Sequence, residues 1–272
     1  KVGDAATFEE AQAVGPLLTH GHSLLTGATS STREMPTGLV PAQLLDEAAG
    51  ARRRRGEYEM ERELQEALLR EKQAKKGEEH PHTLSAKGEL ASALSNSGQH
   101  TEAEEKYREV LEVTRRVLGE EHPDTLMAKG NLAYGLSKMD KHAEAVEMYR
   151  TVQPSMRRVL GDEDPETLTV MNNLADSFRE LGNHKKALKK YGNVLEARRR
   201  VLGEEHPDTL RVMASLASAL CDTDQYAEAL EMSRTVVATM RRVLGEKHPE
   251  TLLAMNIEQS AVNRIDVTDD TA

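Results

Sequence analysis

Residues 115–126 read RRVLGEEHPDTL, and the chain repeats this stretch at a fixed interval. Residues 157–168 read RRVLGDEDPETL, residues 199–210 read RRVLGEEHPDTL, and residues 241–252 read RRVLGEKHPETL. A more divergent copy, QAKKGEEHPHTL, occupies residues 73–84, and the prolines of successive copies are 42 residues apart. A fixed period of roughly 20–50 residues indicates a solenoid, in which one supersecondary unit is stacked on copies of itself.

Each copy of the stretch has the features of a connection between two helices. The paired arginines fit the last turn of a helix, where positive charge favours the negative end of the helix dipole. The glycine that follows, such as Gly119, fits a left-handed residue that ends a helix. The proline fits the first position of the next helix, where its missing N–H costs no hydrogen bond. We therefore expect two helices in each repeat unit.

The residue before the proline is a histidine in four copies and Asp164 in the fifth. Aspartate is a favoured N-cap, so the exchange predicts that a histidine ring nitrogen caps the other helices. Four histidines at one repeated position could also be read as metal ligands. Successive copies should lie about 10 Å apart, however, whereas zinc needs its ligands within about 2 Å of one ion. We therefore predict helix capping and no metal site at His80, His122, His206 and His248.

Composition excludes several classes of protein. The chain has 272 residues with 36 basic and 46 acidic side chains, and this net charge of −10 argues against general affinity for nucleic acid. Aromatic residues make up 3% of the chain, which fits helix pairs packed through Ala and Leu better than one large globular core. The single Cys221 excludes an internal disulfide. No apolar run approaches the ~20 residues that a membrane-spanning helix needs.

The sequence divides into four regions. Residues 1–40, rich in Gly, Ala, Thr and Ser, are expected to be an extended N-terminal arm, in which His20 and His22 lack a third metal ligand and favour a plain loop. A degenerate capping helix pair is expected at 41–79, followed by four full repeats at 80–247. A capping helix with a polar outer face, at about 249–263, and an acidic tail are expected within 248–272. Pro154 falls inside a second helix and should kink it or remove a hydrogen bond.

One unit carries a recognisable set of residues, namely Asn131, Leu132, Ala133, Leu136, His142, Ala145 and Tyr149, next to the LGEEHPDTL linkers. This set resembles the tetratricopeptide repeat, in the 42-residue form found in kinesin light chains and nephrocystin-like proteins. The resemblance covers about residues 41–263. It implies an all-α fold, a right-handed α-α superhelix with degenerate capping units at its ends.

By that resemblance, a peptide partner binds along the concave face that the first helices form. Asn131 and Asn173 match the family asparagines that hydrogen-bond the backbone of a bound peptide, whereas Glu89 and Ser215 at the matching positions do not. The inner positions are otherwise mostly small and neutral. A clamp of several Lys and Arg for a C-terminal carboxylate, as in the chaperone-docking members, is therefore not expected. Further partner-binding residues are expected on this face at Asn172, Tyr134, Lys138, Arg179 and Arg211.

The sequence contains no motif that carries out chemistry. A glycine loop for phosphate, a nucleophile elbow and a His/Cys/Asp set with metal spacing are all missing, so we predict neither an enzyme nor a cofactor. We predict a non-catalytic interaction scaffold that binds a protein or peptide partner through the solenoid surface. The alternative is a structural accessory subunit of a larger assembly, such as an organellar one, held by the N-terminal arm and the solenoid ends. We expect the cytoplasm, with an organelle after presequence removal as the alternative.

The arm generates a prediction from its composition alone. Ordering its backbone costs about 1–2 kcal/mol per residue, and each large apolar side chain offsets only about 1.5–3 kcal/mol when fully buried. We therefore predict that limited proteolysis of the isolated protein cuts within residues 1–40 first, and that a partner protects them. An arm that stays intact in the isolated protein would contradict this. The substantial apolar anchors of the arm are Phe8, Leu17, Leu18, Leu24 and Leu25.

Overall fold

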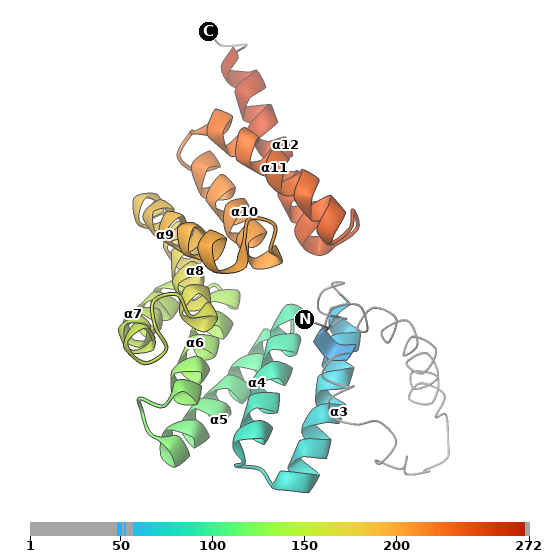
Figure 1. Cartoon of the computed structure of the whole chain (residues 1–272), viewed down its shortest axis with the longest axis vertical. Helices are drawn as coiled ribbons and strands as arrows, with labels where there is room; N and C mark the ends of the chain where they lie inside the picture. The colour runs from blue at the N-terminus through green and yellow to red at the C-terminus, as the bar shows by residue number, and fades with distance from the viewer. Residues whose placement is uncertain (1–47, 51, 53–56, 270–272) are drawn as a thin grey trace, which may run out of the picture. The chain divides into compact units, whose positions relative to one another are not determined.

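The 42-residue period reappears as a succession of paired helices in a computed structural model of the chain (Figure 1). The structure describes residues 48–50, 52 and 57–269, with side chains up to residue 265. Of these described residues 83% are helical and none lies in a strand, which confirms the predicted all-α solenoid of stacked helix pairs. The arm at 1–40, with its two histidines, and residues 270–272 of the tail lie outside the described residues.

The described helices alternate between first and second helices of successive pairs. A short helical stretch at 48–50 precedes α3, and each later pair consists of a helix that begins at the repeated proline and a second helix. None of these helices is both long and apolar enough to cross a membrane. The bounds are α3 Tyr58–Lys76, α4 Pro81–Asn96, α5 His100–Leu118, α6 Pro123–Lys138, α7 His142–Val159, α8 Pro165–Glu180, α9 His184–Leu202, α10 Pro207–Cys221, α11 Tyr226–Val243 and α12 Pro249–Asp269.

The first helices of successive pairs lie closer together than the second helices do. Each helix packs against its neighbours in the chain, and in addition α4 meets α6, α6 meets α8, α8 meets α10, and α10 meets α12. Among the described helices, α5, α7, α9 and α11 make no corresponding contacts with one another. A stack with this asymmetry curves toward its first helices. We call α4, α6, α8, α10 and α12 the inner row.

Small residues allow the helices to pack this closely. Two sets of alanines, one on the first helices and one on the second, are 0% exposed. Two glycines on α6 leave no room for a side chain: a Cβ at Gly130 would lie 2.9 Å from Val170, and one at Gly135 would lie 2.9 Å from the ring of Tyr107. Large side chains fill the remaining space, as expected for a close-packed interior. The buried alanines are Ala91, Ala133, Ala175 and Ala217 on the first helices, and Ala103, Ala145, Ala187 and Ala229 on the second.

The predicted caps are present. The ring nitrogen Nδ1 of His122 accepts a hydrogen bond from the backbone N–H of Asp124 at 3.2 Å, and His80, His206 and His248 make the same contact. Asp164 accepts from two backbone N–H groups, at 2.9 and 3.2 Å. Histidine and aspartate therefore both accept a hydrogen bond from the first turn of the helix, which confirms the capping hypothesis.

The glycine that ends a second helix departs from the prediction in one respect. Gly119 has φ 91° and ψ 167°, so its φ is positive as expected, but its ψ is extended and not left-handed helical. Only glycine adopts this region readily, because any Cβ would be strained there. The left-handed helical conformation predicted for this position is therefore wrong. Helix α7 runs through Pro154 and ends at Val159, one residue earlier in its repeat than α5 does.

Ion pairs join each linker to the next. Arg116, near the end of α5, pairs with Glu79 of the preceding linker at 2.6 Å, and Arg242 pairs with Glu205 at 2.6 Å. The same contact recurs in the two repeats between them, so four matched pairs run along one edge of the stack. All are exposed, and such pairs contribute little to stability individually.

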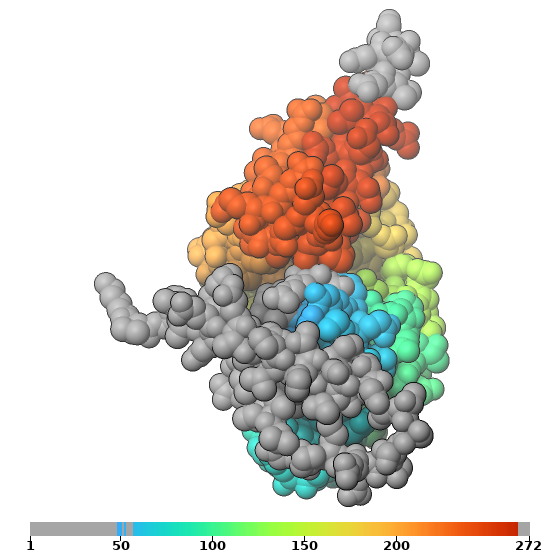
Figure 2. Space-filling view, turned by 90° about the vertical axis from the view of Figure 1, so that its right-hand side faces the viewer, coloured from blue at the N-terminus to red at the C-terminus, as the bar shows by residue number. Residues whose placement is uncertain are grey.

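The last helix differs from its predicted form. Helix α12 continues to Asp269, and it packs beside α11 at the C-terminal end of the repeats (Figures 1 and 2). Further along α12 the exposed residues are polar, which fits the predicted polar outer face: Asn256, Gln259, Ser260, Asn263 and Arg264. Leu252 and Leu253 near its start are the exception, at 47% and 58% exposed. The reason is that no second helix follows α12 in the described residues to cover it. The leucines matched to Leu252 are only 1–2% exposed: Leu84, Leu126, Leu168 and Leu210.

The shared capping role generates a prediction. His122→Ala removes the acceptor for the first turn of α6 and should lower the free energy of unfolding by about 1 kcal/mol. His122→Asp installs the residue that the chain itself uses at 164 and should retain most of the stability. Urea denaturation of both variants measures the difference. Equal losses for Ala and Asp would show that the imidazole acts through packing and not as a cap.

Candidate functional site

The inner row carries two asparagines at matched positions of neighbouring helices. Asn131 on α6 and Asn173 on α8 each lie eight residues after the proline that begins the helix. The side chain of Asn131 is exposed and that of Asn173 is half-buried. Glu89 and Ser215, both half-buried, hold the same position on α4 and α10. The structure therefore places the two asparagines one repeat apart on adjacent helices of the inner row.

Tyr134 and Lys138 also lie on the inner row, where they connect α6 to α4. The Tyr134 hydroxyl donates a hydrogen bond to Oδ1 of Asn96 at 3.1 Å. The ammonium of Lys138 lies 5.3 Å from the centre of the Tyr134 ring, within the range of a cation–π contact. Lys138 is exposed and Tyr134 is half-buried. Both side chains can therefore be reached from solvent while holding a fixed position.

The two predicted arginines are already engaged in contacts between neighbouring repeats. Arg179 on α8 donates to the Ser218 hydroxyl on α10 at 2.8 Å. Arg211 on α10 contacts a carboxylate oxygen of Asp208 and one of Glu250, each at 2.9 Å. Their charges therefore link α8 to α10 and α10 to α12. Neither arginine presents an unused charge to a partner.

Asn172 differs from the other predicted residues because it is only 5% exposed. Its amide nitrogen donates to Asp176 Oδ2, one turn further along α8, at 3.0 Å, while its Oδ1 has no partner among the described residues. The structure thus places Asn172 within the packing between helices and not on the open surface. The residues at the matching position of the other repeats are small: Gly88, Gly130 and Ala214.

A buried polar network surrounds Asp176. The hydroxyl of Tyr191 donates to the Asp176 carboxylate, and burial together with that negative charge raises the pKa of Tyr191. Burial also raises the pKa of Asp176, which the hydrogen bond from Tyr191 opposes. The hydroxyl of Tyr149 is buried without a partner within 3.5 Å. Burial and the negative charge of Asp176 raise the pKa of Tyr149 well above its usual range, and the nearby Asn173 side chain opposes this only in part. Two equivalent tyrosines therefore differ in whether the hydroxyl is satisfied.

Arg198 on α9 is a residue that sequence reasoning missed. It is 3% exposed, and its guanidinium reaches the junction of α8 and α10, where it contacts Thr169 and the backbone of Asp208. The sequence contains a signal for it, because Arg198 is the only charged residue at this position among the four full repeats. The residues at this position in the other three full repeats, all buried, are Thr114, Met156 and Met240.

Glu166, in the first turn of α8, lies near acidic groups of other inner-row helices. Its side chain is exposed, yet burial raises its pKa, and the negative charges of Asp164, Glu89 and Asp208 raise it further. Glu89 belongs to α4 and Asp208 to α10, so acidic groups from three helices of the inner row act on the same region.

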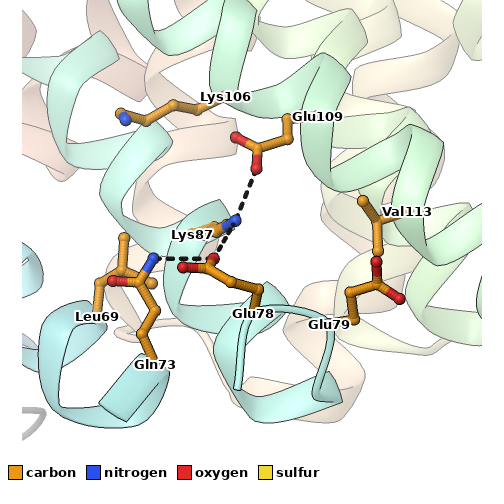
Figure 3. A pocket seen from close by; sticks show the side chains of 8 residues that line it. All are labelled: Leu69, Gln73, Glu78, Glu79, Lys87, Lys106, Glu109 and Val113. Carbon is orange, nitrogen blue, oxygen red and sulfur yellow. Dashed lines mark hydrogen bonds and ion pairs between the residues drawn. The ribbon is translucent and has the colours of Figure 1, made fainter.

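A recess of about 460 Å³ lies elsewhere, between α3, α4 and α5 (Figure 3). The buried ammonium of Lys87 occupies its centre and pairs with Glu109 at 2.6 Å and Glu78 at 2.9 Å. Glu79 on its rim pairs with Arg116 of the linker ladder. Because these charges already have partners, the recess has the character of a structural ion-pair network.

Comparison with known proteins identifies the repeat. The tetratricopeptide repeat (TPR) family matches residues 82–156, 128–192 and 166–232, which together span more than half of the chain. The chain belongs to the tetratricopeptide repeat family. TPR repeats of this type are typical of protein–protein interaction scaffolds. No curated protein matches the chain in sequence.

Solved structures agree with this assignment. One is a crystal structure of kinesin light chain-type repeats from Podosopora anserina, described as nearly identical TPR-like repeats. It is 27% identical in sequence to this chain, with a TM-score of 0.54, and the match covers 78% of this chain and 98% of that one. BtubC (BKLC) from P. vanneervenii is 19% identical with a TM-score of 0.56, over 76% of this chain and 82% of that one. PlcR from Bacillus thuringiensis, in complex with the peptide PapR7 and DNA, is 11% identical with a TM-score of 0.60, over 82% and 74%. The last two likenesses concern the fold alone.

The two tyrosines generate a prediction. Tyr191→Phe removes a hydrogen bond to a carboxylate and should lower the free energy of unfolding by about 2 kcal/mol. Tyr149→Phe removes a buried hydroxyl that has no partner and should leave stability unchanged or slightly increased. Urea denaturation measures both. A larger loss for Tyr149→Phe than for Tyr191→Phe would contradict this assignment of the network.

Proposed function

We propose that the chain is a non-catalytic interaction module that binds an extended peptide segment along the inner row. The observation that carries the proposal is the position of Asn131 and Asn173, one repeat apart on adjacent inner helices. A side-chain amide both donates and accepts, so it can pair with the N–H and C=O groups of an extended backbone. Two such amides on a rigid frame hold a peptide without reading its sequence.

The charges of the inner row support recognition through the backbone. Arg179 and Arg211 are balanced by partners on neighbouring repeats, so they hold the frame together. The polar groups left for a partner are the exposed amide of Asn131 and the half-buried amide of Asn173. Tyr134 and Lys138 extend the surface toward α4 with an aromatic face and a flexible cation. A peptide lying from α4 to α8 would therefore meet an aromatic ring and then two amides.

The comparisons support a peptide as the class of partner. The PlcR structure contains the peptide PapR7, and a Rap protein of related fold was solved with the Competence and Sporulation Factor. Both are about one-tenth identical to this chain, so they support the fold and the type of ligand but assign no residues.

A second function, as an accessory subunit of a larger assembly, is favoured by the end of the solenoid. Leu252 and Leu253 are exposed on α12 where complete repeats bury the matched leucine. Exposed leucines at the end of a stack would be covered if another subunit continued the packing there. In this function the inner row only supports the structure, and the main contact with the partner is made by the surface of α12 around Leu252 and Leu253.

The Asn131→Ala/Asn173→Ala double variant tests the first function. Each lost backbone hydrogen bond should cost about 1 kcal/mol, so a peptide selected on the full chain from a displayed random library should bind about 30-fold more weakly. Fluorescence polarisation measures the affinity, and the midpoint of urea unfolding should not change. Asn193→Ala, at an exposed asparagine of α9, is the matched control and should bind normally.

The same measurement separates the two functions. If the double variant binds as tightly as the original chain, and a Leu252→Gln/Leu253→Gln variant does not bind, the contact is made by the end of the solenoid. The peptide-binding proposal would then fail.

A further inference from the structure

The guanidinium of Arg198 is a buried charge without a counter-ion. Only 3% of the residue is exposed, and no carboxylate among the described residues forms an ion pair with it. A buried charge is strongly disfavoured unless it is paired and hydrogen-bonded. The matched residues Met156 and Met240 show that an apolar side chain fits this position in other repeats. The arginine is therefore not required by the packing of the repeat.

The contacts of Arg198 use only part of its hydrogen-bonding capacity. Nη1 donates to the backbone carbonyl of Asp208 at 2.9 Å, and Nη2 donates to the Thr169 hydroxyl at 3.0 Å. Both acceptors are neutral. A guanidinium carries five N–H donors in a planar fork that matches a carboxylate. The contacts therefore orient the group between α8 and α10 and leave donors for a further acceptor.

Three carboxylates act on Arg198 from a distance, and none of them forms an ion pair with it. Burial lowers the pKa of Arg198, and the positive charge of Arg211 acts in the same direction, while Asp208, Glu166 and Asp176 oppose them. The Asp208 side chain is engaged by Arg211, which also holds Glu250. Glu166 is exposed and makes no ion pair among the described residues.

We propose that Arg198 anchors one carboxylate of a peptide ligand, at the junction of α8 and α10 on the inner row. A carboxylate accepts two parallel N–H bonds from a guanidinium, and this supplies the missing counter-ion. A doubly charged phosphate fits less well, because Glu166 and Asp208 add negative charge next to the site. The peptide as carrier of the carboxylate rests on the proposed function. Arg198 itself comes from a second helix, and so differs from a clamp of cations on the first helices.

Glu166 has the opposite effect on the same ligand. Its ionised carboxylate lies near Arg198 and repels an incoming anion. Glu166→Gln should therefore strengthen carboxylate binding by about two- to fivefold, the effect of one nearby charge in a partly solvated site. A ligand with a cationic group at this junction would respond in the opposite direction, so the sign of this change identifies the charge of the ligand.

The test uses the full chain and two small probes, N-acetylglycinate and its uncharged analogue N-acetylglycinamide, at constant ionic strength. The readout is the NMR signal of the Arg198 Nε–H group, assigned by its absence in Arg198→Met, together with the melting temperature. N-acetylglycinate should shift the signal in a saturable way and raise the melting temperature, and the amide should do neither. Arg198→Met should weaken the thermal response about tenfold or more. Lys87→Met, at a buried cation that already has two carboxylate partners, is the matched control and should respond normally.

Three outcomes would overturn the proposal. The first is an equal response to N-acetylglycinamide or to inorganic phosphate, and the second is an unchanged response in Arg198→Met. The third is weaker carboxylate binding in Glu166→Gln, which also decides the matter if Arg198→Met does not fold. The Asn131→Ala/Asn173→Ala variant should retain the response to N-acetylglycinate. Loss of peptide binding in that variant therefore tests the proposed function separately from the carboxylate site.

Discussion

The close approach of helices at fully buried alanines is the constraint on which the rest of the structure depends. Ala133 on α6 and Ala145 on α7 have no exposed surface, and the matched alanines of the other repeats are equally buried. A larger side chain at either position would separate the helices, and interiors at this packing density do not absorb extra volume cheaply. The contacts between successive first helices follow from this spacing. So does the inner row, and with it the distance between Asn131 and Asn173.

Two residues differ in kind from those at the matched positions of the other full repeats. The third full repeat has Asn172 where the other repeats have Gly or Ala, and Arg198 where they have Thr or Met. Both exceptions meet at the junction of α8 and α10, close to the Asp176 network. Buried polar groups are costly unless they are satisfied, so their concentration at one junction is not explained by the stability of the frame. This junction is where the chain departs from a purely structural repeat.

The sequence predicts the frame well because the frame is local. The repeated proline marks where each first helix begins, the histidine or aspartate before it caps that helix, and the repeated glycine ends each second helix. Each of these residues acts within a few residues of its own position. The candidate site is less predictable because it depends on contacts between residues 29 to 39 positions apart in the sequence, such as Arg198 with Thr169 and Arg211 with Glu250. The periodicity of the helix does not predict that Asn172 is buried against the neighbouring helix pair while Asn173 beside it is only half-buried. The exposure of Leu252 and Leu253 on α12 likewise depends on what packs next to them.

The four linker-to-linker ion pairs, from Arg116–Glu79 to Arg242–Glu205, make one edge of the stack sensitive to salt. Each pair joins one linker to the next along one edge of the stack, and all are exposed to solvent. Dissolved ions screen such pairs over about 8 Å at physiological ionic strength, so the attraction between successive linkers weakens as salt rises. The apolar contacts of the buried alanines carry no charge and are not screened in this way.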